Sequence, residues 1–163
     1  MFRLSGFQKQ KGLATIEFTL LVPFFLLIIF ATAEFGRGLY QYSQLTRMIR
    51  DAARHLSQSV ITTGNGVPAD STGKVLDANC NNCITETKMI LKHGANSVSP
   101  LLLNEIDTAV ITIEESPLGS GIMVISVDYD WSPIFFDQLS GFGLGDGIDL
   151  SFNLNSTYAV RAI

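Results

Sequence analysis

The first residues that could do chemistry are a glycine and, five positions later, a glutamate at the start of an apolar segment. The segment runs from Leu13 to Ala33, and Glu17 is its only charged side chain. A carboxylate inside an apolar segment costs free energy unless it is paired, so such residues often have a function. However, Glu17 lies only about 6 Å along a helix that starts at Leu13. Its carboxylate could therefore also extend to lipid headgroups and have no role.

The second candidate is a cysteine pair, Cys80 and Cys83, in a polar Cys-Asn-Asn-Cys stretch. In an oxidising compartment such a pair favours a disulfide that closes a small loop. A structural zinc site needs four ligands, and only His55 and His93 could add to the pair, at spacings unlike those of zinc fingers. A thioredoxin-type redox motif would follow a strand, and no strand-like segment precedes this one. We expect a disulfide here, with no metal and no cofactor.

No set of residues in the sequence predicts an enzyme. Neither His55 nor His93 has a neighbouring Ser or Cys together with an acid to orient it. Asp128 and Asp130 share one face of a predicted strand and could suggest a carboxylate pair or calcium ligands. Two acids two positions apart on a polar strand face also arise by chance. We therefore expect no catalytic residue.

The apolar segment has the length of a membrane span, because about 20 helical residues cross the hydrocarbon layer. Arg3, Lys9 and Lys11 precede it without any acid, which favours a cytoplasmic N-terminus and places residues 35–163 outside. This exported part has eight basic and 13 acidic residues, a net charge of −5. Phosphate binding needs clustered basic residues, so we expect no nucleic-acid partner.

After the apolar segment the pattern stays helical but becomes amphipathic, with apolar residues at steps of three and four. We expect one helix from Leu13 to Ile61, about 70 Å long. Pro23 lies inside it and should kink it, which membrane helices tolerate. The apolar stripe of the second half consists of Phe35, Leu39, Tyr42, Leu45, Ile49, Ala52, Leu56 and Val60.

The residues between this helix and the predicted strands, 62–107, begin with glycine, proline and small polar residues that favour turns. The segment Thr85 to His93 could form a short helix. Thr85 would be its N-cap and Gly94 its C-terminal stop.

From residue 108 onward the apolar pattern has a period of two. Residues 108–115 and 121–131 are rich in β-branched side chains and are joined by a hairpin-type connection. A third strand, Ile148 to Arg161, alternates apolar and polar residues, which is typical of an antiparallel sheet with one covered face. The sequence therefore predicts an α+β fold, a long N-terminal membrane and stalk helix packed on a small antiparallel β-sheet head.

This outline resembles the type IV pilin-like proteins, and within them the TadE-like minor pilins, or pseudopilins, of tight adherence (Flp, type IVb) pilus systems. The match is close over residues 12–60, looser over the last strands, and absent over 62–107. The residues that carry it are Gly12, Ala14, Glu17, Phe18, Pro23, Glu34, Phe35, Gly36 and Arg37.

The resemblance implies that a prepilin peptidase cleaves between Gly12 and Leu13 on the cytoplasmic side of the inner membrane, usually with methylation of the new N-terminus. Glu17 would then pair with the new amine of Leu13 on a neighbouring subunit. The implied partners are the lipid bilayer, other pilin or minor pilin subunits and the inner-membrane assembly platform, with a periplasmic head that reaches the pilus after assembly. The implied segments are a leader (1–12), a transmembrane half (13–33), an amphipathic half (34–61), a loop region (62–107) and the sheet (108–163).

Two alternatives make no use of Glu17. The sequence Ala31-Thr32-Ala33 reads as the cleavage site of a secretory signal peptide, although the apolar region is longer than usual and contains an acid. Alternatively, an uncleaved anchor could hold a binding or sensor domain outside the membrane. The three possibilities predict mature N-termini at Leu13, Glu34 and Met1.

Overall fold

The computed structural model describes residues 8–63, 67, 69–77, 80, 82–94, 100–134, 138–139, 148–149 and 151–162. The chain divides into two compact units, Met1–Arg37 and Gly38–Ile163. One α-helix, α1 (Gln8–Thr63), contributes to both units.

The expected single long helix is confirmed, and Pro23 lies inside it. The helix begins at Gln8 rather than at Leu13, so Gly12 is helical. The physical reason is the run Gln-Lys-Gln-Lys before Gly12, since these residues are good helix formers and a single glycine costs only about 1 kcal/mol.

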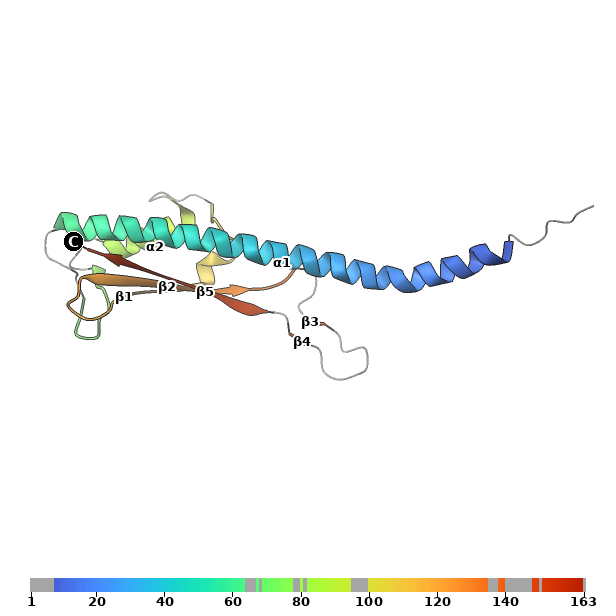
Figure 1. Ribbon diagram of the computed structural model, residues 1–163. Helices are drawn as coiled ribbons and strands as arrows, with labels where there is room; N and C mark the ends of the chain where they lie inside the picture. The colour runs from blue at the N-terminus through green and yellow to red at the C-terminus, as the bar shows by residue number, and fades with distance from the viewer. Residues whose placement is uncertain are drawn as a thin grey trace, which may run out of the picture. The chain divides into compact units, whose positions relative to one another are not determined.

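In the second unit, the C-terminal part of α1 lies along the sheet and buries one stripe of side chains against it (Figure 1). Of the expected stripe, the members from Leu45 onward are buried, and Met48 and Ala53 join them. Leu39 and Tyr42 of this unit are exposed, so the prediction that they pack on the sheet is wrong, and Phe35, in the first unit, is exposed as well. The buried helix residues are Leu45, Met48, Ile49, Ala52, Ala53, Leu56 and Val60.

The sheet has three antiparallel strands in the order β1 (Val110–Glu115), β2 (Ile122–Trp131) and β5 (Phe152–Arg161). The central strand β2 pairs along its whole length with β5, from Ile122 opposite Arg161 to Trp131 opposite Phe152. Alternate residues of β2 are buried and complete the core with the helix stripe. They are Met123, Ile125, Val127, Tyr129 and Trp131.

The third predicted strand is interrupted. Ile148–Asp149 forms a separate strand, β4, that pairs with β3 (Gln138–Leu139), and β5 begins only at Phe152. The reason is the length of the neighbouring strand. β2 ends at Trp131, the partner of Phe152, and Pro133 two residues later has no N–H with which to extend the ladder. The predicted glycine-rich loop at 141–147 lies outside the described residues.

Two other boundaries differ from the sequence expectation. The helix α2 runs from Cys83 to His93 with Asn82 at its N-cap position, so Thr85 is not the N-cap. Gly94 is the expected stop, with φ of 74° and an N–H that donates to the carbonyl of Ile90 at 2.7 Å. The first predicted strand starts later because Ile106–Thr108 forms a 3₁₀ turn, η2.

A turn around Asp70 covers part of the outer edge of β1. Asp70 Oδ1 accepts the N–H of Thr72 at 2.8 Å and the N–H of Lys74 at 3.0 Å. These hydrogen bonds, with that of the Thr72 hydroxyl as the largest cause, lower the pKa of Asp70 below 3.8. The turn brings the N–H of Val75 to 3.3 Å from the carbonyl of Ile113, which satisfies an edge group that would otherwise be open to another strand.

We predict that the inward and outward faces of β2 differ in energetic importance. Ile125→Ala removes a fully buried side chain from the centre of the core and should lower the free energy of unfolding by about 2–5 kcal/mol. Val124→Ala, on the opposite and only half-buried face, should cost clearly less. Denaturant unfolding of the full chain in detergent, followed by the fluorescence of its single tryptophan, measures both. Equal losses would contradict this packing.

Candidate functional site

The residues expected at the processing and assembly site lie on the first turns of α1 in the first unit. Gly12, Leu13 and Glu17 are all helical and exposed. A Cβ placed on Gly12 would meet nothing within 4 Å. Gly12 has no side chain, and the space where one would project is open. A large partner could therefore approach the backbone from that side.

The helix around Glu17 exposes an almost continuous apolar surface, with Leu13 72% and Phe18 67% exposed. Two threonine hydroxyls in the apolar half of the helix donate to carbonyls of the helix itself. The hydroxyl of Thr19 donates to the carbonyl of Thr15 at 2.8 Å, and that of Thr32 donates to the carbonyl of Ile28 at 2.7 Å. A helix in lipid needs such internal hydrogen bonds, because lipid offers its polar groups no partner. Among the described residues, α1 is long and apolar enough to cross a membrane, judged by length and composition.

The apolar segment ends at an ion pair. Arg37 Nε donates to Glu34 Oε2 at 3.0 Å, one helical turn apart. Pairing reduces the cost of both charges where the helix would pass from lipid into water.

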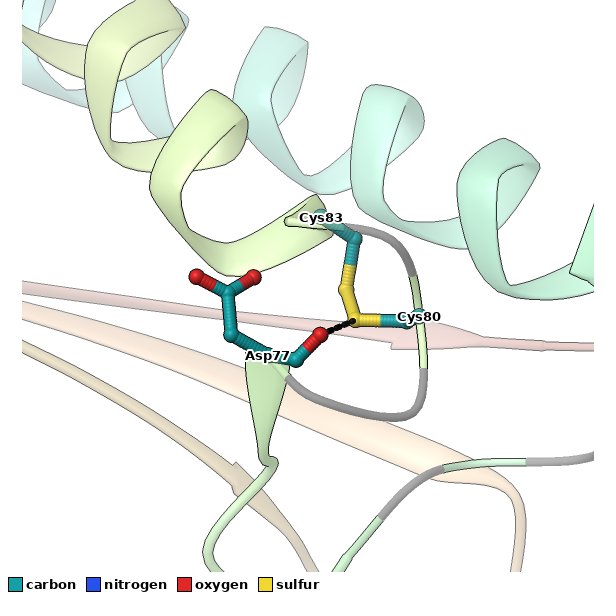
Figure 2. Close-up of side chains that lie close together, drawn as sticks. All are labelled: Asp77, Cys80 and Cys83. Atoms are coloured by element: carbon teal, nitrogen blue, oxygen red, sulfur yellow. Dashed lines mark hydrogen bonds between the residues drawn. A yellow bond between two sulfur atoms is a disulfide. The ribbon is translucent and has the colours of Figure 1, made fainter.

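The cysteine pair lies in the second unit, just before and at the start of α2 (Figure 2). Cys80 and Cys83 form a disulfide, with their Cα atoms 5.4 Å apart. Both residues are buried and belong to the core under α1. The disulfide therefore attaches the loop before α2 to the start of that helix.

Asp77 lies beside the disulfide, with its carboxylate toward the first turn of α2 (Figure 2). Its Oδ1 accepts the N–H of Ile84 at 2.9 Å and that of Thr85 at 3.5 Å, and its Oδ2 accepts the Thr85 hydroxyl. Asn82 occupies the N-cap position with a left-handed φ of 66° and makes no side-chain cap. Asp77 therefore performs the capping that the local residue does not, and places a negative charge at the positive end of α2.

Asp77, Cys80 and Cys83 offer three possible ligand atoms within 4.8 Å of one another. Metal binding by cysteine requires thiolates, and here each sulfur is bonded to the other. The carboxylate oxygens are already engaged by α2. This arrangement fits a structural element that fixes the start of α2 and does not fit a metal centre.

The residues weighed for catalysis have other surroundings. His55 Nε2 is 3.7 Å from Glu86 Oε2, a contact between α1 and α2. Asp128 and Asp130 lie on the outward side of β2, opposite Asn155 and Asn153 of β5. Among the described residues, neither His55 nor these two acids belong to the one cluster of possible metal ligands, Asp77, Cys80 and Cys83.

Asp77 is the residue that the sequence did not reveal. Capping residues are found by looking immediately before a helix, and Asp77 lies seven residues before Ile84. The loop that the disulfide closes brings it back to the helix end. No local signal pointed to it, because Asn82, directly before the helix, is itself a residue type that caps helices well.

The chain thus combines a long helix, apolar over its first half, with a small antiparallel sheet that covers the second half of that helix. Residues 12–54 match the family described as TadE-like protein. The match makes this segment similar to TadE-like proteins. No curated protein and no solved structure matches it.

We predict that Asp77 acts by capping. Asp77→Ala leaves the first N–H groups of α2 without their acceptor and should lower the free energy of unfolding by about 1–2 kcal/mol. Asp77→Asn, the matched control, keeps an acceptor oxygen and should lose much less. Both can be measured by denaturant unfolding of the oxidised protein. Equal losses for the two variants would show that the charge, and not the cap, is what matters.

Proposed function

We propose that this chain is a minor pilin or pseudopilin that serves as a structural component or initiation factor in the assembly of Tad-type pili. The observation that carries the proposal is the position of the family match. It begins at residue 12, the glycine after which cleavage is expected, and it includes the apolar helix and Glu17. The TadE-like family suggests a component associated with Tad pili, and other pilus components as its partners.

The proposed topology follows from α1. Its exposed apolar half is compatible with a single membrane anchor. The basic residues before it favour a cytoplasmic N-terminus, so we propose that the second unit lies in the periplasm. A disulfide in that unit agrees with an oxidising compartment.

Cleavage after Gly12 would give Glu17 a partner. It would create an amine at Leu13 and remove the leader with Lys9 and Lys11. Before cleavage, the charges of these lysines keep the start of the helix at the cytoplasmic interface. The new amine of one subunit and Glu17 of its neighbour would then neutralise each other in lipid. Such pairing favours one axial register between adjacent helices, because any other leaves a charge buried without a partner.

The leader joins the mature chain through helical backbone, since α1 starts at Gln8. A peptidase that binds extended backbone would have to unwind the turn around Gly12. Glycine makes this easier, because it favours the helix less than almost any other residue.

The first test is the mature N-terminus. Mass spectrometry of the N-terminal peptide from membranes should find a chain that begins at Leu13 when the prepilin peptidase is present. Without the peptidase the chain should keep its leader. A start at Glu34 would instead identify a secretory signal peptide and overturn the proposal. A start at Met1 in the presence of the peptidase would identify an uncleaved anchor.

The second test concerns Glu17 itself. Glu17→Leu raises the hydrophobicity of the span, so insertion into the membrane should be unchanged while pilus assembly is strongly reduced. Glu17→Asp is the matched control, because it keeps the charge and should retain part of the function. Piliation is counted by electron microscopy at equal protein levels. Normal piliation with Glu17→Leu would show that the carboxylate has no role in assembly.

A further inference from the structure

The strand β5 forms one edge of the three-stranded sheet, and among the described elements it pairs only with β2. An edge strand presents backbone N–H and C=O groups to which another extended segment can bind. β5 is 10 residues long, whereas proteins often keep exposed edge strands very short. Its outer edge is therefore one continuous backbone surface within the second unit.

The hydrogen bonds at the end of the sheet show which backbone groups of β5 point outward. The N–H of Ala162 donates to the carbonyl of Gly121 at 2.9 Å, whereas the carbonyl of Ile122 accepts the N–H of Ser116, on the other side of β2, at 3.0 Å. Backbone groups in an antiparallel ladder alternate in direction, so every second residue of β5 directs its N–H and C=O away from β2. Among the described residues, these outward groups have no hydrogen-bond partner. They belong to Asn153, Asn155, Thr157, Ala159 and Arg161.

The other edge of the sheet, along β1, is already partly occupied. The carbonyl of Ile113 accepts the N–H of Val75 at 3.3 Å, and the N–H of Glu115 donates to the carbonyl of Gly73 at 2.6 Å. Proteins protect edge strands by such cover, by charged side chains and by proline. β5 contains no proline, and Arg161 at its end is its only charged residue. The two edges therefore differ, and only that of β5 is open to a further strand along its length.

The side chains of β5 indicate what an added strand would contact. Those opposite the buried residues of β2 lie on the face that α1 covers. Two of them stay partly open to solvent, since Phe152 is 49% and Tyr158 38% exposed. Leu154 lies between them on the same face and is half-buried. An added strand with apolar side chains on this face would cover these rings, and its polar side chains would lie beside Asn155 on the other face.

The charge of the second unit indicates which kind of segment would bind. Residues 38–163 contain seven basic and 13 acidic residues, a net charge of 7 − 13 = −6. Asp130 is exposed on the polar face, directly opposite Asn153 of β5. Two copies of so acidic a unit repel each other, whereas a basic segment is attracted. The charge therefore favours a segment of a different protein over a second copy of this chain.

We propose that the outer edge of β5 binds an extended segment of another protein, which adds to the sheet as a fourth strand. The segment would run antiparallel to β5, like the other strand pairs of this sheet. It would alternate apolar side chains, on the face that α1 covers, with uncharged or basic side chains on the other face. All the groups involved belong to the second unit, so the proposal depends neither on membrane anchoring nor on cleavage after Gly12.

The first test uses peptides in which valine alternates with threonine or lysine, together with the unaltered full chain in detergent. In an antiparallel pair, the added strand donates to β5 from the residues directly opposite Asn155 and Thr157, which are the threonine and lysine positions. N-methylation at these positions should abolish binding, and N-methylation at the valine positions should preserve it. Fluorescence anisotropy of the labelled peptides measures both. Binding of neither peptide, equal binding of both, or binding of only the peptide methylated at threonine and lysine would overturn the proposal.

Amide hydrogen exchange of the full chain then locates the bound peptide. In the free protein, the five outward amides of β5 should exchange much faster than the amides of Leu154, Ser156 and Tyr158, which bond to β2. The peptide methylated at valine, at ten times its Kd, should slow the outward amides by about tenfold. Protection of other amides only would overturn the proposal. Outward amides that become protected without peptide as the protein concentration rises would identify a second copy as the occupant, and would overturn it as well.

A matched pair of variants tests one outward group. Thr157→Pro removes an N–H that the ladder with β2 does not use, and edge strands tolerate proline at such positions. It should weaken peptide binding by about tenfold, whereas Thr157→Val keeps the N–H and should bind as the unaltered chain does. Unchanged binding by Thr157→Pro, with native tryptophan fluorescence, would overturn the proposal. The comparison of methylated peptides decides the matter if this variant does not fold, because it leaves the protein unaltered.

Discussion

The structure depends on the burial of one helix stripe against the inner face of β2. Leu45, Ile49 and Leu56 are inaccessible to solvent and meet Ile125 and Val127 of the central strand in a single core. At about 25 cal/mol per Å² of apolar surface removed from water, such burial is the main favourable term for a small sheet. Three strands with one apolar face need a covering layer to be stable, and α1 provides it.

The first half of the same helix, in the first unit, has a different surface. In the first unit its large side chains are apolar and exposed, as Leu13, Phe18 and Phe24 illustrate. Exposure of this apolar surface to water is unfavourable in free energy. Contact with lipid or with the apolar faces of other helices would remove it from water in either case. A helix of this composition is compatible with the proposed role, in which it is held first in a membrane and later among other subunits. Asp77, the disulfide and the turn around Asp70 only secure the loops around the sheet.

Much of this could be predicted from the sequence, because long periodic patterns report which side of an element is covered. The steps of three and four from Leu45 to Val60 and the alternation along β2 were enough for the α+β fold. The break before Phe152 was not predictable, because it depends on where the neighbouring strand β2 ends, at Trp131. Capping by Asp77 was missed for the same kind of reason, since it acts across a loop. The exposure of Leu39 and Tyr42 depends on how far the sheet extends along α1, which a periodic pattern does not report.

The central claim is that one helix serves two apolar environments, lipid over its first half and protein over its second. Spin labels placed one at a time along α1 of the vesicle-bound protein test it directly, by their collisions with oxygen and with a water-soluble nickel complex. Between Ile16 and Ala33 we expect high oxygen and low nickel accessibility on all sides. Between Leu45 and Val60 the oxygen accessibility and the nickel accessibility should both oscillate with the helical period, with minima at the residues of the buried stripe. Nickel accessibility that oscillates through the first half as well would contradict the account, because that half would then lie on a protein surface in water.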